Sequence, residues 1–255
     1  MSVTTSIDGR VAWIVLDRPD RMNAITVELA RGLREAIVSL GADPAVNVMV
    51  IRGSGGNFCA GGDFEEVERL RAQGPAALAQ LFTLFREACD AIAGVEVPVV
   101  VAVEGVAAAG GFELMQAADI VLVSDTARIA DNHINFGMVP GGGSTARLPR
   151  IVGRQQALGV LLSGDRLSGL DAVRLGLAYR SFAPDEFDEG IGRVATRLAE
   201  RRRDAVTTIK RLVAIGVDDG LQAGLDAEMD AVVRHIAGDA GSSSVTAFQS
   251  REVRT

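Results

Sequence analysis

The chain has little that would tie it to an oxidising compartment, a membrane or a nucleic acid. Only two cysteines, Cys59 and Cys89, occur in 255 residues, and no signal-peptide pattern precedes the first strand-like run, which predicts a reducing, cytoplasmic location. The longest apolar run, residues 97–109, is interrupted by a proline and a glutamate and is too short to span a bilayer. A net charge of −7 and 4% aromatic residues argue against nucleic acid as the main partner.

Nucleotide-binding signatures and repeats are absent as well. No GxGxxG follows the first strand-like run, no GxxxxGK[ST] occurs anywhere, and no internal repeat is found. With 48% hydrophobic residues, the chain is long enough to bury one large core, either as a single domain or as a domain with an appendage.

Strand-like and helix-like patterns alternate over most of the chain, which predicts an α/β fold. The strand-like segments are residues 3–17, which reads as a hairpin or an edge strand, 46–53, the run from 99, 120–124 and 127–136. The predicted helices are 26–40 with Thr26 as N-cap, 64–94 with a break at Gly74 and Pro75, one capped by Ser144 or Thr145, and one opening on the SGLD capping box at 168–171.

The chain beyond Pro184 reads almost wholly helical, over residues 188–203, 205–216 and 221–236. Residues 1–190 are therefore predicted to form the core with the site, and residues 191–255 a helical region. We expect these terminal helices to pack on the core or on another subunit.

Two Gly-rich loops, each at the end of a strand-like run, are the clearest chemical signal. The first is CAGGDF at residues 59–64, and the second is AAAGGFE at 107–113, where a buried strand feeds a helix that carries Glu113 in its first turn. Unpaired amides at such turns attract negative charge. If each loop supplies one N–H to the same oxygen, the pair can stabilise an enolate or a tetrahedral oxyanion, although glycines can also simply terminate strands.

The order of several motifs resembles the enoyl-CoA hydratase/isomerase, or crotonase, superfamily over nearly the whole chain. The motifs are RPDRMNAI, NFCAGGDF, EGVAAAGGFELMQAADI, FGMVPGGGSTARLPRIVG and GLDAVRLGLA. The resemblance implies a spiral of repeated ββα units followed by helices that build a homotrimer or a dimer of trimers. It also implies an acyl-CoA thioester as substrate, with no metal or redox cofactor because coenzyme A is part of the substrate.

By the same resemblance, the two oxyanion amides fall on Gly62 and Gly110, and Glu113 matches the first of the two glutamates that hydratases use to hold and deprotonate water. The second glutamate is replaced here by His133. A Glu/His pair can still perform acid–base work, because histidine titrates near neutrality.

His133 lies in ARIADNHINFG. If this piece is extended, alternation puts Asp131, His133 and Asn135 on one face, where the acid could fix the tautomer of the ring. Otherwise His133 is a structural hydrogen-bonding residue at the end of a strand. His235, near the end of a helix, is assigned no function.

The resemblance also places Ala60, Asp63, Phe64, Arg21 and Ala24 beside the substrate. Asp63 is better explained as the N-cap of the helix from Phe64, and Arg21 either reaches a phosphate or is a solvated turn charge. The further lining of the pocket is expected from residues 74–84 and from the last helices.

Three functions are compatible with these residues. The first is hydration of a 2-enoyl-CoA, with Glu113 as base on water and His133 passing a proton to Cα. The second is retro-Claisen cleavage of a β-dicarbonyl compound or β-ketoacyl-CoA, with His133 as general base. The third is binding of acyl-CoA or RNA without catalysis, against which the acidic pI, the few aromatics and the intact Glu113 argue.

Overall fold

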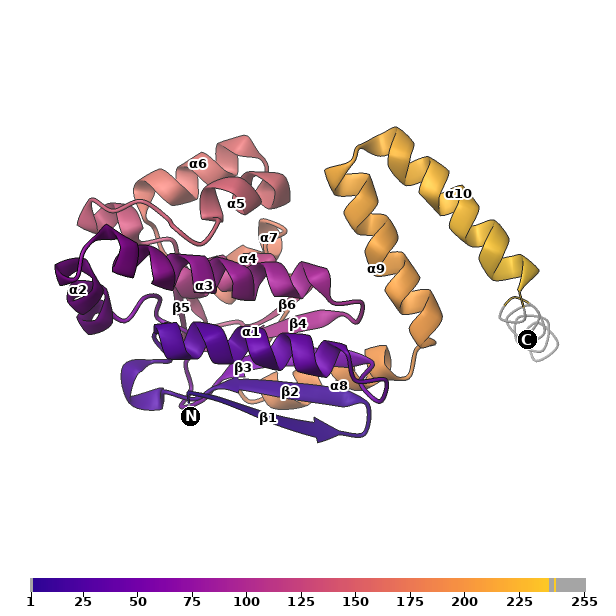
Figure 1. Ribbon diagram of the computed structural model, residues 1–255, viewed down its shortest axis with the longest axis horizontal. Coiled ribbons are helices and arrows are strands. Elements are labelled where there is room, and N and C mark those ends of the chain that lie inside the picture. Colours follow the sequence, from indigo (N-terminus) through magenta and orange to yellow (C-terminus); the bar gives the residue numbers. More distant parts are fainter. Residues whose placement is uncertain (1, 239–240, 242–255) are drawn as a thin grey trace. The chain divides into compact units, whose positions relative to one another are not determined.

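The computed structural model describes residues 2–238 and residue 241. The chain forms two compact units that divide between Arg201 and Arg202. The first unit holds all the described strands, and the second holds the last two helices (Figure 1).

A six-stranded sheet runs through the first unit in the order β1-β2-β3-β4-β6-β8. Its strands are β1 (Val3–Asp8), β2 (Val11–Leu16), β3 (Val48–Gly53), β4 (Val99–Val103), β6 (Ile120–Ser124) and β8 (Arg180–Phe182). β1 and β2 form the predicted antiparallel hairpin, and all other neighbours in the sheet pair in parallel. Parallel pairing puts the carboxyl ends of β3 and β4 at one edge, so the loops that follow them start side by side.

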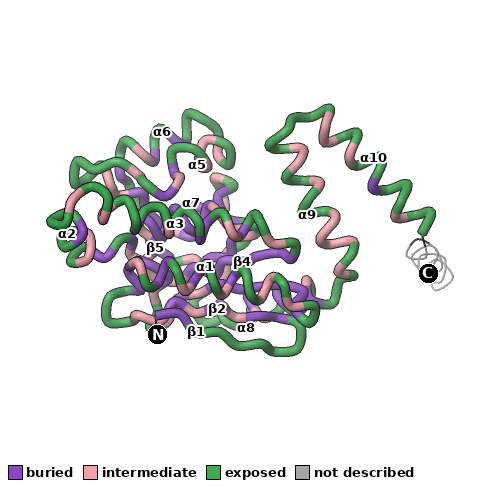
Figure 2. The backbone as a smooth tube through the Cα atoms, in the orientation of Figure 1, coloured by how far each residue is buried: buried purple, intermediate pink, exposed green. Residues whose placement is uncertain are grey.

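The central strands β3 and β4 are buried on both faces, and their alternate residues serve different cores (Figure 2). In β3, Met49 and Ile51 pack into the large core with α1 (Val27–Gly41) and α3 (Pro75–Gly94), whereas Val48 and Val50 face α8 (Phe187–Ala199). The predicted division at residue 190 cuts through α8, yet this helix packs as a whole against the sheet. It belongs to the first unit.

The remaining helices of the first unit lie in the connections between its strands. They are α2 (Phe64–Ala72), α4 (Gly110–Ala117), α5 (Ser144–Val152), α6 (Arg154–Ser163), α7 (Gly169–Arg174) and the short 3-10 helices η1 (Pro19–Arg21) and η2 (His133–Phe136). Local signals set several of these ends. The Thr26 hydroxyl caps α1 by accepting from the Leu29 amide at 3.1 Å, the break at Gly74 and Pro75 separates α2 from α3, and Ser168 with Asp171 forms the predicted capping box.

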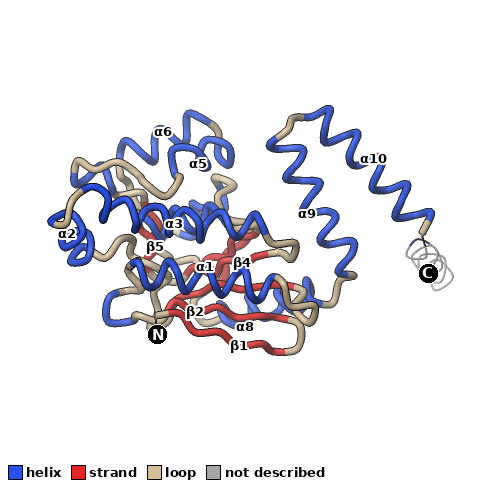
Figure 3. The backbone as a smooth tube through the Cα atoms, viewed as in Figure 1, coloured by secondary structure: helices blue, strands red, loops and turns tan. Residues whose placement is uncertain are grey.

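Short extended segments recur along the chain and form a second, smaller layer. β5 (Val106–Ala108) pairs in parallel with β7 (Arg128–Ala130), and isolated bridges join Ile25 to Gly62 and Cys59 to Ala107. Successive turns of the chain thus supply one strand to the large sheet, one extended piece to the small layer and then helix (Figure 3). The predicted α/β spiral of ββα units is confirmed.

Two local predictions are wrong. Residues 127–136 do not form one strand, because β7 ends at Ala130 and the chain turns into the 3-10 helix η2, which closes on Gly137 at φ +66°. Neither Ser144 nor Thr145 caps α5, whose cap residue is Gly143. The free amides at this helix start donate instead to the carboxylate of Glu113, which replaces a local capping side chain.

The second unit contains α9 (Arg203–Asp218) and α10 (Leu221–Ala237), which pack against each other. They approach closely near their connection, where a Cβ on Gly224 would lie 2.8 Å from the Cα of Gly216. Apolar side chains remain exposed along both helices, among them Ile209, Val213, Leu225, Met229 and Val233. Assembly through these helices stays a prediction, and the end of the predicted C-terminal region, 242–255, lies outside the described residues. None of the described helices is both long enough and apolar enough to cross a membrane.

Candidate active site

The two Gly-rich loops are joined by main-chain hydrogen bonds. The Cys59 amide donates to the Val106 carbonyl at 2.9 Å, and the Ala108 amide donates to the Cys59 carbonyl at 3.0 Å. The bonds bring Gly61 next to Gly110, since a Cβ on Gly61 would lie 3.2 Å from the Gly110 nitrogen. The predicted convergence of the loops is therefore present.

The amides of Gly62 and Gly110 are available at this junction. Both residues line the same cavity, and within the described residues neither amide donates to a protein acceptor. Gly110 is the first residue of α4, where no helical partner exists for its N–H. Two unpaired donors on one cavity wall can hold one oxygen that gains negative charge.

The backbone before Gly110 is strained. Ala109 has φ +47° and ψ −115°, a conformation that costs a non-glycine residue about 1–3 kcal/mol and that tends to occur at functional sites. Gly111 is required for a different reason, because a Cβ there would lie 2.1 Å from the Cys59 carbonyl oxygen. These features allow the first turn of α4 to press against the neighbouring loop.

Cys59 itself takes no direct part. Its thiol is fully enclosed, and burial raises its pKa to about 12 against the opposing influence of a backbone hydrogen bond and of Arg18. The thiol therefore stays protonated at neutral pH and is a poor nucleophile.

Glu113 lines the cavity and is buried, with only 2% of its surface exposed. Its Oε1 accepts hydrogen bonds from the amides of Gly142, at 2.6 Å, and Ser144, at 3.2 Å. Burial raises the pKa of the carboxyl group, although these two bonds and the charge of His133 act in the other direction. Glu113 is thus held by one oxygen and is a stronger base than an exposed glutamate.

His133 is held by Asp131, which is 1% exposed. The ring Nδ1 lies 2.6 Å from Oδ1 of Asp131, so the neutral ring carries its hydrogen on Nδ1 and leaves Nε2 free. Burial lowers the pKa of His133, but the bond to Asp131 and the charges of Asp131 and Glu113 outweigh it, and the net shift is upward. Asp131 Oδ2 is buried without a hydrogen-bond partner among the described residues.

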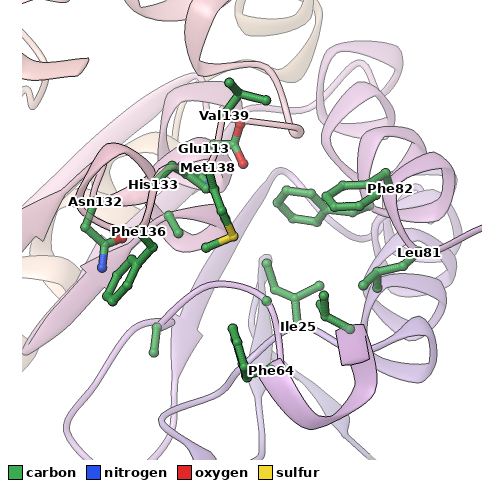
Figure 4. A pocket seen from close by; sticks show the side chains of 16 residues that line it. Ile25, Phe64, Leu81, Phe82, Glu113, Asn132, His133, Phe136, Met138 and Val139 are labelled. Atoms are coloured by element: carbon green, nitrogen blue, oxygen red, sulfur yellow. The ribbon is translucent and has the colours of Figure 1, made fainter. Parts of the chain in front are cut away.

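A cavity of about 280 Å³ brings these groups together (Figure 4). Glu113 and His133 share it with the two glycine amides, with Ala60 and Phe64 as predicted, and with Leu81 and Phe82 from the predicted 74–84 segment. The full lining is Ile25, Ala60, Gly62, Phe64, Val67, Leu81, Phe82, Phe85, Ala109, Gly110, Glu113, Asn132, His133, Phe136, Met138 and Val139.

Three of the residues predicted to contact substrate lie outside this lining. The carboxylate of Asp63 caps α2 by accepting from the Glu66 amide at 3.2 Å, and it also pairs with Arg18 at 2.8 Å. Arg21 makes two bonds to Glu65 on the surface, at 2.9 and 3.1 Å. Ala24 is buried, and its carbonyl accepts from Arg18.

The sequence interpretation missed Arg18 and the turn at Gly142–Ser144. Arg18 braces the loop of Gly62 by binding Asp63, a contact between residues 45 positions apart that carries no local signal. The PGGGST run did signal a helix start, but nothing in its letters showed that its amides bind Glu113. Among the described residues no three His, Cys, Asp or Glu side chains converge as metal ligands do.

The α/β spiral holds Glu113 and His133 in one cavity with two glycine amides that donate to no protein acceptor among the described residues, and this arrangement is typical of an enzyme. A family model described as enoyl-CoA hydratase/isomerase matches residues 6–253, and the chain belongs to that family. The predicted family and the enzyme class that it implies are confirmed.

Individual relatives agree with this assignment. The chain is similar to a crotonyl-CoA hydratase of Syntrophomonas wolfei, with 29% identity over 94% of this chain and 92% of that protein. It is similar to a mitochondrial enoyl-CoA hydratase of Pongo abelii, with 30% identity over 94% of this chain and 81% of that protein. The crystal structure of an enoyl-CoA hydratase from Polaromonas sp. JS666 superposes with a TM-score of 0.93 at 28% identity, over 98% of this chain and 97% of that one.

Proposed function

We propose that the protein adds water across the double bond of a 2-enoyl-CoA. The relatives named above are hydratases of enoyl-CoA and crotonyl-CoA, and the acyl-CoA substrate is carried over from them. The observation that carries the proposal is that Glu113, His133 and the free amides of Gly62 and Gly110 line one cavity. Coenzyme A is part of the substrate, and the reaction needs no other cofactor.

In the proposed reaction, Gly62 and Gly110 donate to the thioester oxygen. Glu113 Oε2 takes a proton from water, and the oxygen of that water forms a bond to Cβ. The electron pair of the double bond moves toward the thioester as an enolate, which the two amides stabilise. His133 starts as the imidazolium, with a hydrogen on each ring nitrogen, and gives its Nε2 proton to Cα. The proton on Glu113 then passes to Nε2 of His133, which restores the starting state.

The electrostatics of the pair support these roles. The upward pKa shift of Glu113 makes it a better base, and the upward shift of His133 keeps its ring protonated to a higher pH. A positioned acid–base group contributes about 10²–10⁴-fold to rate, and one oxyanion donor about 10²–10³-fold. Oligomers built through α9 and α10, as homotrimers or pairs of trimers, and a cytoplasmic location belong to the same proposal.

The test is incubation of the purified protein with a panel of 2-enoyl-CoA thioesters that includes crotonyl-CoA. Hydration is expected to remove the enone absorbance and to increase the product mass by one water. If the enone absorbance and the mass of every thioester in the panel stay unchanged, in a folded protein that binds acyl-CoA, the non-catalytic alternative is favoured.

A retro-Claisen reaction is the second candidate, and the Asp131–His133 pair favours it. An imidazole whose Nδ1–H is held by a buried carboxylate is a strong general base. It could activate water to attack the ketone of a β-ketoacyl-CoA. The Cα–Cβ bond would then break to give a carboxylic acid and a thioester enolate, which takes a proton at Cα. Release of a shorter acyl-CoA and a free acid from β-ketoacyl-CoA, without hydration of enoyl-CoA, would establish this reaction instead.

A further inference from the structure

The cavity concentrates the aromatic side chains of a chain that has few of them. Four of the nine phenylalanines line it, namely Phe64 from α2, Phe82 and Phe85 from α3 and Phe136 from η2. These helices come from separate turns of the spiral, so the cluster is a product of the fold rather than of one sequence motif.

Two of these rings are exposed at the cavity. The relative exposure is 67% for Phe64 and 68% for Phe136, and Met138 and Val139 beside them are exposed as well. In Figure 4, Phe64, Phe136, Met138 and Phe82 lie around the space toward which the Glu113 carboxylate points, and His133 lines the same cavity. Scattered exposed apolar side chains are normal, but a contiguous group around a concave site marks the binding surface of an apolar ligand.

The volume sets the size of that ligand. An apolar cavity of about 150 Å³ holds one benzene ring, so about 280 Å³ has room for roughly ten carbon atoms. When the thioester carbonyl is placed at the two amides and one water at Glu113, space for roughly eight carbons remains. The four carbons of a crotonyl group would leave much of the apolar wall uncovered.

We propose that the site selects apolar acyl groups of about eight to ten carbons, linear or ring-bearing, over a four-carbon group. This inference rests on the proposed function for the identity of the thioester, but it concerns the size and polarity of the acyl group. The four phenylalanines give the wall no charged or hydrogen-bonding group, so polar substituents on the acyl chain are disfavoured.

The first test measures binding without turnover. Saturated thioesters have no double bond to hydrate, so the unaltered protein can be titrated with butanoyl-CoA, decanoyl-CoA and 3-phenylpropanoyl-CoA by calorimetry. Each buried CH₂ contributes a factor of about four in affinity, and burial of half of the six additional methylenes gives about 50-fold tighter binding of decanoyl-CoA. The phenylpropanoyl thioester shows whether a ring is accepted as well as a chain. Equal affinity for butanoyl-CoA and for both larger thioesters would overturn the inference.

The second test compares variants. Phe82→Ala removes one wall of the cavity, and Val38→Ala is the control, because Val38 also lies exposed on a helix but does not line the cavity. We expect Phe82→Ala to reduce the decanoyl-to-butanoyl affinity ratio about 10-fold or more, and Val38→Ala to leave it unchanged. An unchanged ratio in Phe82→Ala, in a folded protein, would contradict the inference.

The two proposals fail separately. Strong preference for the larger thioesters without hydration of any enoyl-CoA would remove the proposed reaction and keep the acyl-group assignment. Hydration of crotonyl-CoA together with equal binding of all three saturated thioesters would do the opposite.

Discussion

Replacement of Glu113 separates its chemical role from its structural role. Glu113→Gln keeps a side-chain oxygen that can accept from the amides of Gly142 and Ser144, but it places an amide where the second carboxylate oxygen was. Glu113→Ala removes both the base and the acceptor. The two variants therefore share a chemical defect and differ in what they do to the start of α5.

The loss of activity is expected to be similar in both variants. Without a base at this position, kcat for enoyl-CoA hydration should fall by about 10²–10⁴-fold. Binding of a saturated acyl-CoA should remain within a few-fold of the wild-type value in Glu113→Gln, because this variant preserves the shape of the cavity.

The stabilities should diverge. In Glu113→Ala two buried amides lose their acceptor, at about 1–3 kcal/mol each, which predicts a loss of roughly 2–6 kcal/mol in the free energy of unfolding. For a protein of this size, 2 kcal/mol lowers Tm by about 4–8 °C. Glu113→Gln should retain a Tm close to that of the wild type.

The pH dependence of stability provides an internal check. Because burial raises the pKa of Glu113, the folded protein keeps a proton that the unfolded chain has already lost, and stability falls as pH rises through the raised pKa. Glutamine does not ionise, so Glu113→Gln should lack this decline and gain stability relative to the wild type as pH increases. Urea unfolding at several pH values measures the difference.

Two results would refute this reasoning. Near-normal hydration by Glu113→Gln would remove Glu113 from the acid–base chemistry. Equal Tm values for the alanine and glutamine variants would show that the bonds to Gly142 and Ser144 contribute little to stability.

Three further predictions follow from the same site. Asp131→Asn should lower the pKa of His133, because it weakens the hydrogen bond to the ring and removes the negative charge that together raise this pKa. The alkaline limb of the kcat–pH profile should then move to lower pH, and an unmoved limb would argue against His133 as the proton donor. Gly110→Pro removes the amide hydrogen at the first position of α4, and kcat should be about 10²–10³-fold below that of the control Gly110→Ala, in which the added Cβ meets the flexible end of Ile25 as well; equal rates would exclude this amide as an oxyanion donor. Asp63→Asn should lower the free energy of unfolding by about 1–3 kcal/mol at neutral pH, because it weakens the pair with Arg18. Since the pKa of Asp63 is lowered in the folded protein, the difference from wild type in urea unfolding should shrink as pH falls, and a constant difference would contradict the ion pair.

The predicted contact between His133 and Asp131 is present, but the predicted extended backbone around them is not. An extended chain would place Asp131 and His133 on one face, whereas the observed chain turns into η2 and the Asp131 carboxylate reaches forward to the ring and, at 3.5 Å, to the amide of His133. Asp commonly makes such a contact two residues along a turn, so the spacing of two serves both geometries. Short polar segments of this kind do not reveal their backbone from periodicity.

Of the residues near Gly62 that were predicted to contact the substrate, the fold brings some to the cavity and directs others away from it. Phe64 lines the cavity, but Asp63 turns away to cap α2 and to bind Arg18, and Arg21 is engaged by Glu65 on the surface. The acidic residues that follow Phe64 gave a hint, since they offer a nearby arginine an ion-pair partner. Which arginine each acid binds depends on how the loops fold back.

The sequence by itself determined the α/β alternation, the two Gly-rich loops and the place of Glu113 in a first helical turn, because these depend on local patterns: hydrophobic period, capping residues and glycine where the backbone must approach closely. His133 was found through the resemblance to the family and not through a local pattern. Only the tertiary structure decided that the PGGGST turn binds Glu113, that four phenylalanines from separate helices form one wall, and that Arg18 braces Asp63. Those contacts join residues far apart in the chain, and their geometry is fixed by the packing of successive spiral turns rather than by any local preference.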